Sequence, residues 1–127
     1  MSYDIWNQRL FEHFFNEDNE GKPVLALGTP SGTRILTCVM QTILNYIEYG
    51  LPLWEAVSMV RIHHQWYPDE LRIGPKGLGK DTEEKLTQMG YKINHKSLGC
   101  KIQAISFEDG ELHGVSDPRE EGLSIGR

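Results

Sequence analysis

The sequence predicts a single α+β domain in which helices are layered on a β-sheet. Three observations lead to this fold class. The run "PVLALG", residues 23–28, is apolar and has the length of a strand. Residues 33–49 carry apolar side chains on one wide helical stripe. Residues 101–115 alternate between apolar and polar on both sides of Asp109-Gly110, a dipeptide that is a strong hairpin signal.

An amphipathic helix is predicted at the start of the chain. Between residues 3 and 15, large apolar side chains recur mostly at steps of three and four. The polar stretch "NEDNEGKP" follows and is predicted to be a linker. We therefore expect two parts: residues 1–20, an N-terminal amphipathic helix with a linker, and residues 21–127, the main segment.

Turn and cap residues set the bounds of the remaining helices. Gly50 stands where the C-terminal cap of the helix over 33–49 belongs. Pro52 opens a second short helix, "LPLWEAVSMV", because proline is tolerated in a first helical turn. Asp81 and Glu84 form a capping signal before "EEKLTQM", and Gly90 closes that third helix.

Charge and composition exclude several classes of partner. The net charge of −5 leaves no basic patch, so the electrostatic attraction that dominates nucleic-acid binding is missing. Binding to a membrane surface is disfavoured for the same reason. The start, "MSYDIWNQRLFEHFF", has no basic region and no continuous apolar run, so neither a signal peptide nor a membrane span is expected. The sequence as written predicts a cytoplasmic chain.

Neither the cysteines nor the histidines form a metal-binding pattern. Cys38 and Cys100 lie far apart and outside any Cys-x-x-Cys pair, which predicts two buried thiols rather than a disulfide, a redox motif or a zinc site. His63 and His64 are adjacent and project in different directions, so a structural role is expected, with one imidazole bonded to buried backbone beside Trp66. We expect no metal and no cofactor. The isolated His13, His95 and His113 are interpreted in the same way.

Two further motifs are interpreted as structural. Gly74, Gly79 and Lys80 satisfy the spacing of a phosphate-binding loop, but Asp81 occupies the position of the Ser or Thr that would hold magnesium. A carboxylate there would repel phosphate, so a nucleotide-binding protein is the weakest alternative. Ser2 could become an N-terminal nucleophile only at the head of a core strand, and a helix is predicted there instead.

Three blocks in the sequence resemble the C-terminal part of a gamma-glutamyltranspeptidase, also called glutathione hydrolase. They are "GTPSGTRILTCVMQTILNYIEYGLPLWEAV", "RIHHQWYPDELRI" and "DGELHGVSDPR", and the similarity runs from about Gly21 to Arg119. The resemblance implies a partial N-terminal-nucleophile hydrolase fold, an αββα sandwich of which this chain is the C-terminal portion. Members of that family cleave themselves to release a threonine that attacks gamma-glutamyl amides. They are commonly periplasmic, secreted or membrane-anchored.

The resemblance also assigns a role to the turn "GTPSG" at residues 28–32. The matching turn of the family contributes two successive backbone N–H groups to the oxyanion hole, and the matching positions here are Ser31 and Gly32. Backbone donors survive a change of side chain. However, Ser31 replaces a glycine, and serine resists the positive φ that glycine tolerates.

The resemblance covers none of the family's other catalytic groups. The nucleophilic threonine, the paired serines that hold the substrate carboxylate, and an arginine of the larger subunit all lie upstream of the matching region. We therefore expect no catalytic nucleophile in this chain, and gamma-glutamyl substrates such as glutathione as partners only when the missing portion is present. A complementing chain, or self-association through exposed sheet edges, is expected. The alternative is a non-catalytic remnant or interaction protein whose N-terminal helix binds a partner.

Overall fold

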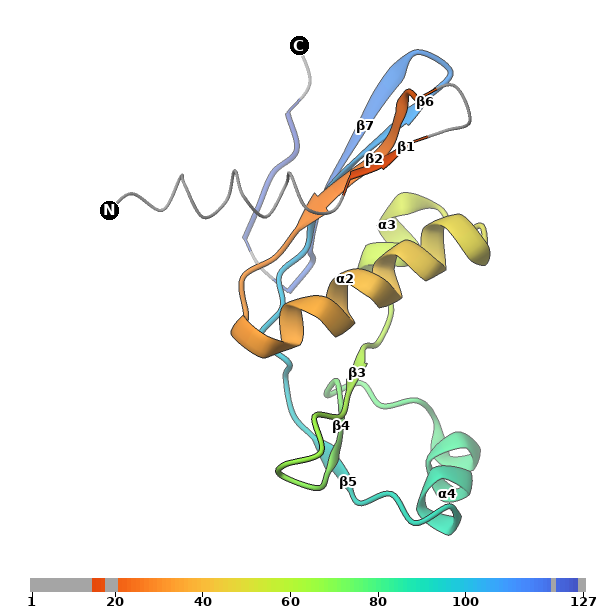
Figure 1. The fold of residues 1–127 in the computed structure, drawn as a ribbon, viewed down its shortest axis with the longest axis vertical. Coiled ribbons are helices and arrows are strands. Elements are labelled where there is room, and N and C mark those ends of the chain that lie inside the picture. Colours follow the sequence, from red (N-terminus) through yellow and green to blue (C-terminus); the bar gives the residue numbers. More distant parts are fainter. Residues whose placement is uncertain (1–14, 18–20, 120, 126–127) are drawn as a thin grey trace, which may run out of the picture.

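The computed structural model describes residues 15–17, 21–119 and 121–125, which form two sheets with helices beside them (Figure 1). The upper part of Figure 1 holds a four-stranded sheet with helices α2 and α3 on one side, and the lower part holds a three-stranded sheet with helix α4. Within this described part, no helix has the length and apolar character that a membrane span requires. The predicted α+β class is confirmed.

The four-stranded sheet contains the predicted strand and the predicted hairpin. Asp109 and Gly110 both have positive φ, 49° and 81°, as a two-residue turn of type I′ requires. The strands are β1 (Phe15–Glu17), β2 (Pro23–Gly28), β6 (Gln103–Glu108) and β7 (Glu111–Ser116), in the order β1-β2-β6-β7, and every neighbouring pair is antiparallel.

Strand β1 corrects the prediction for the start of the chain. Residues 3–14 of the expected helix lie outside the described residues, but Phe15 belongs to β1, and Asn16 and Glu17 form strand where a linker is predicted. Asn16 pairs with Leu25 of β2. The local pattern missed this strand because "NE" is polar and carries no strand signal of its own, and its extended form depends on pairing with β2.

The helical layer covers the face of this sheet that carries Leu25 and Leu27. The predicted helix over 33–49 is confirmed, although it consists of a 3₁₀ turn η1 (Gly32–Arg34), helix α2 (Ile35–Ile43) and a π turn η2 (Leu44–Glu48). Helix α3 (Leu53–Ser58) follows Pro52 as expected. The core between the layers is formed by Leu25, Leu27, Cys38, Val39, Leu53, Val57, Leu98, Cys100, Ile102 and Ala104.

The three-stranded sheet is built around a parallel pair of strands connected by α4. The expected third helix is present, but it begins at Lys80, after Gly79, and no side chain caps it, so the predicted capping role of Asp81 and Glu84 is wrong. The elements are β3 (Ile62–His63), β4 (Leu71–Ile73), α4 (Lys80–Gln88) and β5 (Ile93–His95); β3 and β4 are antiparallel, and β4 and β5 are parallel.

A disulfide joins Cys38 of α2 to Cys100, which lies between β5 and β6. Their Cα atoms are 6.5 Å apart although 62 positions separate them in the sequence. The prediction of buried cysteines is confirmed, but the prediction of two free thiols is wrong. Sequence separation does not report distance in space, and the packing of α2 against the segment before β6 brings the two sulfur atoms together.

A buried ion pair connects the end of β7 to the segment before β3. Asp117 is fully buried, and its Oδ2 accepts hydrogen bonds from Arg61 Nη2 (2.8 Å) and Ile102 N (2.9 Å). Its Oδ1 accepts from Arg119 N (3.0 Å) and Arg119 Nη1 (2.9 Å). Burial acts to raise the pKa of Asp117, but these hydrogen bonds and the Arg61 charge outweigh burial, so its pKa lies below the ordinary value.

Replacing this buried carboxylate is expected to destabilise the fold strongly. Asp117→Asn leaves the buried Arg61 without its counter-charge, so the free energy of unfolding should fall by about 3–5 kcal/mol in urea titrations. Asp81→Asn, at an exposed position, is the control and should cost less than about 1 kcal/mol.

The contribution of Asp117 to stability is expected to depend on pH. Because the folded pKa of Asp117 is lowered, its contribution to the free energy of unfolding is complete above the unfolded pKa of about 3.9 and is lost as pH falls through the folded pKa. Equal acid sensitivity of wild type and variant would contradict this assignment.

The disulfide is expected to contribute about 2–4 kcal/mol to stability, because it closes a long loop in the unfolded chain. The Cys38→Ser/Cys100→Ser double variant should therefore unfold at a lower urea concentration than the oxidised protein. Adding a dithiol reductant should shift the wild-type midpoint and leave that of the double variant unchanged. If the reductant shifts neither protein, the two cysteines are not crosslinked in solution.

Candidate functional site

The loop between β2 and η1 contains the two residues that the sequence assigns to an oxyanion hole. The buried strand β2 ends at Gly28, and the next residue, Thr29, is also buried. Thr29 Oγ1 accepts a hydrogen bond from Lys101 N (2.7 Å) and donates one to the Pro30 carbonyl (2.8 Å). The start of the loop is thereby fixed to the chain that leads into β6.

Ser31 and Gly32 both lie in the left-handed region of backbone space. Their φ angles are 143° and 59°, and only the second residue is a glycine. A non-glycine residue in such a conformation costs on the order of 1–3 kcal/mol, so other contacts must hold it there. Ser31 Oγ donates to the Leu98 carbonyl at 2.7 Å and accepts from Arg34 Nε at 3.1 Å.

The N–H groups of Ser31 and Gly32 are successive donors at the start of a helical segment. In the described part of the chain, neither has a hydrogen-bond acceptor, as is usual for the first donors of a helix. Ser31 is half-buried and Gly32 is exposed, so an anion in solution can approach both. Two such donors at the positive end of η1 and α2 are suited to bind a negatively charged oxygen.

The segment Leu98–Cys100 also lies at this loop, and sequence reasoning missed its contribution. Gly99 has a φ of 73°, and a Cβ there would lie 3.2 Å from Ser31 Oγ. Cys100 is anchored to α2 by the disulfide. The stretch "LGC" matches no motif, so no local signal could have found these residues.

His63, His64 and His95 have hydrogen-bond partners within the chain, but not all of the expected kind. The buried His63 contacts Thr37 Oγ1 through Nδ1 (2.7 Å) and Gln65 Oε1 through Nε2 (2.9 Å), so both partners are side chains rather than backbone. His64 Nδ1 accepts from Trp66 N at 3.1 Å on the surface. The described residues contain no group of three or more side chains suited to hold a metal ion. His13 and Ser2 lie outside the described residues.

The loop that resembles a phosphate-binding loop is occupied by a carboxylate. Glu83 Oε1 accepts a hydrogen bond from Leu78 N (2.9 Å), and a Cβ at Gly77 would lie only 2.8 Å from this oxygen. Its other oxygen contacts His95 Nε2 at 2.9 Å. These two hydrogen bonds, the one from His95 first, lower the pKa of Glu83, so it is charged at neutral pH. A negative charge inside the loop opposes the binding of a nucleotide's phosphates.

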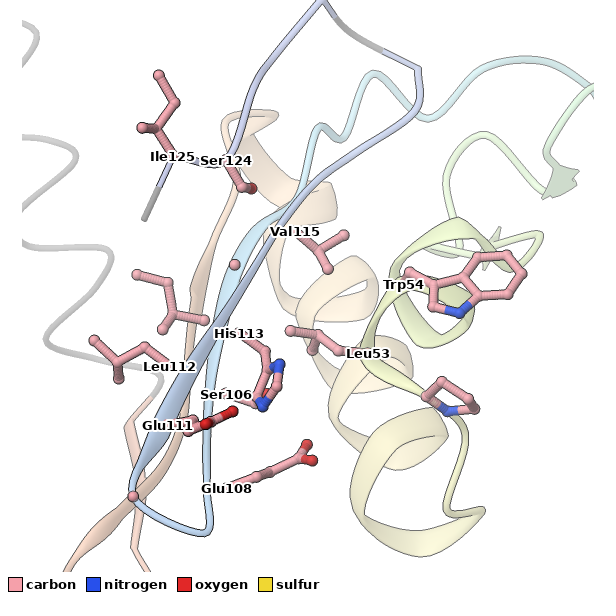
Figure 2. A pocket seen from close by; sticks show the side chains of 14 residues that line it. Leu53, Trp54, Ser106, Glu108, Glu111, Leu112, His113, Val115, Ser124 and Ile125 are labelled. Atoms are coloured by element: carbon pink, nitrogen blue, oxygen red, sulfur yellow. The ribbon is translucent and has the colours of Figure 1, made fainter. Parts of the chain in front are cut away.

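A groove of about 1000 Å³ runs along β7, the last strand of the four-stranded sheet (Figure 2). Figure 2 shows Leu53, Trp54 and Val115 on the α3 side of this strand, and Leu112 and Ile125 on its other side. At one end of the groove, Tyr46 OH donates to the Glu108 carboxylate. Burial, and then that hydrogen bond, raise the pKa of Tyr46. The groove contains exposed apolar side chains beside a strand edge, a combination typical of surfaces that another segment covers.

Comparisons with known proteins agree on one family. The family model described as Gamma-glutamyltranspeptidase matches residues 14–126. The glutathione hydrolase proenzyme of Escherichia coli (strain K12) is 46% identical over 101 residues, which cover 79% of this chain and 17% of the relative. The match to the family model begins at residue 14, before Gly21. The division of the chain at Gly21 therefore stays a prediction.

Solved structures resemble the chain over most of its length. A gamma-glutamyltranspeptidase from Pseudomonas nitroreducens complexed with L-DON has a TM-score of 0.82 and 33% identity, covering 89% of this chain and 60% of that one. An acivicin-inhibited gamma-glutamyltranspeptidase has a TM-score of 0.79 and 41% identity, covering 85% and 59%. This chain therefore spans about a fifth of the length of its curated relatives and forms part of the N-terminal-nucleophile hydrolase fold. The family match, the identities and the shared fold together establish that the chain belongs to the gamma-glutamyltranspeptidase family.

Proposed function

We propose that this chain supplies the oxyanion-binding part of an enzyme that hydrolyses or transfers the gamma-glutamyl group of amides such as glutathione. The observation that carries the proposal is the pair of N–H groups at Ser31 and Gly32, which have no acceptor among the described residues, in a member of this family. Their positive φ angles and their place at the start of a helical segment give two neighbouring donors without any catalytic side chain.

The chemistry of these donors follows from the charge that forms during attack. When a nucleophile adds to the gamma-carbonyl carbon, the carbonyl oxygen becomes an oxyanion, and fixed N–H donors stabilise it more than they stabilise the neutral amide. One such donor is worth about 2.7–4 kcal/mol of barrier in acyl-transfer enzymes. The nucleophile itself has no match in the sequence and comes, in this proposal, from the rest of the family fold.

Exposed apolar surface supports the proposal that a second part of the protein packs against this chain. Along the helical layer, exposed side chains recur at steps of four, four and three, where a solvent-facing helix is ordinarily polar. Leu36 is 70% exposed in this row, and strand β7 is the last in its sheet. We assign this surface to the remainder of the family fold, in the same polypeptide or in a complementing chain. The row consists of Leu36, Met40, Leu44 and Ile47.

The C-terminus has a known role in one related structure. In the acivicin-inhibited gamma-glutamyltranspeptidase, the C-terminus of that protein has critical roles in autoprocessing and catalysis. Our proposal takes the present chain as the C-terminal part of the family, on the three blocks of sequence resemblance. We therefore propose that it completes an active site rather than containing one, and that these 127 residues alone are inactive.

Activity should depend on completing the fold. The 127-residue chain is expected not to hydrolyse a chromogenic gamma-glutamyl anilide above a heat-killed control. A chimaera in which residues 21–119 replace the matching segment of the Escherichia coli relative should hydrolyse it, because the donors and the nucleophile are then together. Turnover by the chain alone, lost on Ser2→Ala, would contradict the proposal and make Ser2 the nucleophile.

A pair of glycine variants of the chimaera tests the location of the site. Gly32 and Gly50 have similar positive φ angles, 59° and 64°, and a Cβ added at either meets no atom within 4 Å. Gly32→Ala and Gly50→Ala therefore impose similar backbone strain, but only the first changes the oxyanion donors. Gly32→Ala should lower kcat by about 10²-fold, while Gly50→Ala leaves it nearly unchanged. Equal losses, or an inactive chimaera that is folded, favour a non-catalytic interaction protein.

A further inference from the structure

Ser31 has a backbone conformation that normally selects glycine. Its φ of 143° and ψ of 27° belong to a region that an L side chain rarely adopts, yet a serine stands at this position. The neighbouring Gly32 needs no external support at φ 59° because it carries no Cβ. Residue 31 does need such support, and its own hydroxyl is the group that makes the contacts.

The hydroxyl of Ser31 both donates and accepts a hydrogen bond. As a donor it binds the Leu98 carbonyl at 2.7 Å, across 67 positions of sequence. As an acceptor it binds Arg34 Nε at 3.1 Å, from the first helical turn after the loop. Gly99 lies directly against the hydroxyl, where a Cβ would come within 3.2 Å of Oγ. The hydroxyl therefore joins the loop to a separate segment of the chain at a position with little free space.

The segment that accepts this hydrogen bond is itself fixed. Leu98 is buried, and two residues later Cys100 is crosslinked to Cys38 in the first half of α2. The next residue, Lys101, donates its N–H to Thr29 Oγ1 at 2.7 Å. Residues 98–101 thus contact the loop at Thr29 and at Ser31, and the disulfide ties them to the helix that follows the loop.

We propose that the Ser31 hydroxyl is a positioning group that, bound to the Leu98 carbonyl of the disulfide-anchored segment, holds residue 31 in a glycine-like backbone conformation. It thereby fixes the directions of the N–H groups of Ser31 and Gly32. The catalytic consequence rests on the function proposed above, whereas the effect on the backbone does not. The hydroxyl and the Cys38–Cys100 crosslink act together, since the crosslink fixes the acceptor of the hydrogen bond.

Two substitutions at residue 31 separate positioning from a simple contribution to stability. Ser31→Ala removes the hydroxyl and keeps the Cβ that disfavours positive φ. Ser31→Gly removes the hydroxyl and also that penalty. If the hydroxyl only adds a hydrogen bond, both variants lose the same contact and behave alike. If it positions the backbone, the glycine variant recovers what the alanine variant loses.

The first measurement uses the 127-residue chain and nuclear magnetic resonance. The N–H to Hα coupling of residue 31 depends on φ, and the amide signals of residues 31–33 report the environment of the donors. Ser31→Ala should change the coupling and shift these signals, while Ser31→Gly should keep the signals of residues 32 and 33 near those of wild type. Ser58→Ala, which removes a hydroxyl that donates to the Trp54 carbonyl in α3, is the control and should leave all three unchanged.

The second measurement tests the crosslink. It compares wild type with Ser31→Gly, so it decides the question even when Ser31→Ala fails to fold. A dithiol reductant opens the disulfide to two thiols and is itself oxidised to a disulfide, so two electrons and two protons pass to the cysteines. Reduction should shift the signals of residues 31–33 in wild type and shift them several-fold less in Ser31→Gly. Equal shifts in the two proteins, or none in wild type, would overturn the proposal.

The third measurement uses the chimaera with the Escherichia coli relative. Oxyanion donors act on the transition state, so Ser31→Ala should lower kcat about tenfold or more with little change in KM, and Ser31→Gly should restore it. Equal kcat values for the alanine and glycine variants would refute positioning. If the chimaera is inactive with serine, alanine and glycine alike, the proposed function fails, and the resonance measurements still decide whether the hydroxyl holds the backbone.

Discussion

The buried carboxylate of Asp117 is the interaction on which the arrangement of the two sheets depends. It lies just after β7 and binds the backbone before β6 at Ile102 and the guanidinium of Arg61, which precedes β3. Three segments that are remote in sequence therefore meet at one charge, and Arg119, two residues after Asp117, also binds it. A buried carboxylate is stable only when such donors surround it, so the position of each segment is fixed by the need to satisfy the same two oxygens.

The candidate site is connected to this buried ion pair. Arg61 also donates to the Cys100 carbonyl at 3.4 Å, so the segment that holds Ser31 is connected to the buried ion pair as well as to the disulfide. The loop itself contributes little packing, since Gly32 is exposed and Ser31 is only half-buried. Exposed N–H donors keep a fixed direction only when the residues that contact their loop are themselves fixed. Here those residues are Leu98, Cys100 and Thr29.

The same structure explains why these residues form part of an enzyme rather than a self-sufficient catalyst in our proposal. The helical layer covers one face of the four-stranded sheet, while apolar side chains such as Leu36 on α2 and Leu112 on β7 remain exposed. Surfaces of this kind gain stability when another layer covers them. The family members described above are longer than this chain, and the matched segment accounts for 59% and 60% of the two solved chains. In our proposal, the oxyanion donors and the nucleophile belong to different parts of one fold.

By itself, the sequence determined the elements whose signals are local. These are strand β2, the continuous helix after Gly32, the helix after Pro52 and the hairpin at Asp109-Gly110, since each follows from periodicity or from a residue with restricted φ. It also located the turn at Ser31 and Gly32, through the resemblance of a short motif. Tertiary structure alone decided that Asn16 and Glu17 form a strand, that Cys38 and Cys100 are joined, and that the Ser31 hydroxyl reaches Leu98. The disulfide and the Ser31 hydrogen bond join residues 62 and 67 positions apart, and the strand at Asn16 depends on its partner β2. No local pattern encodes which atoms the fold brings within bonding distance.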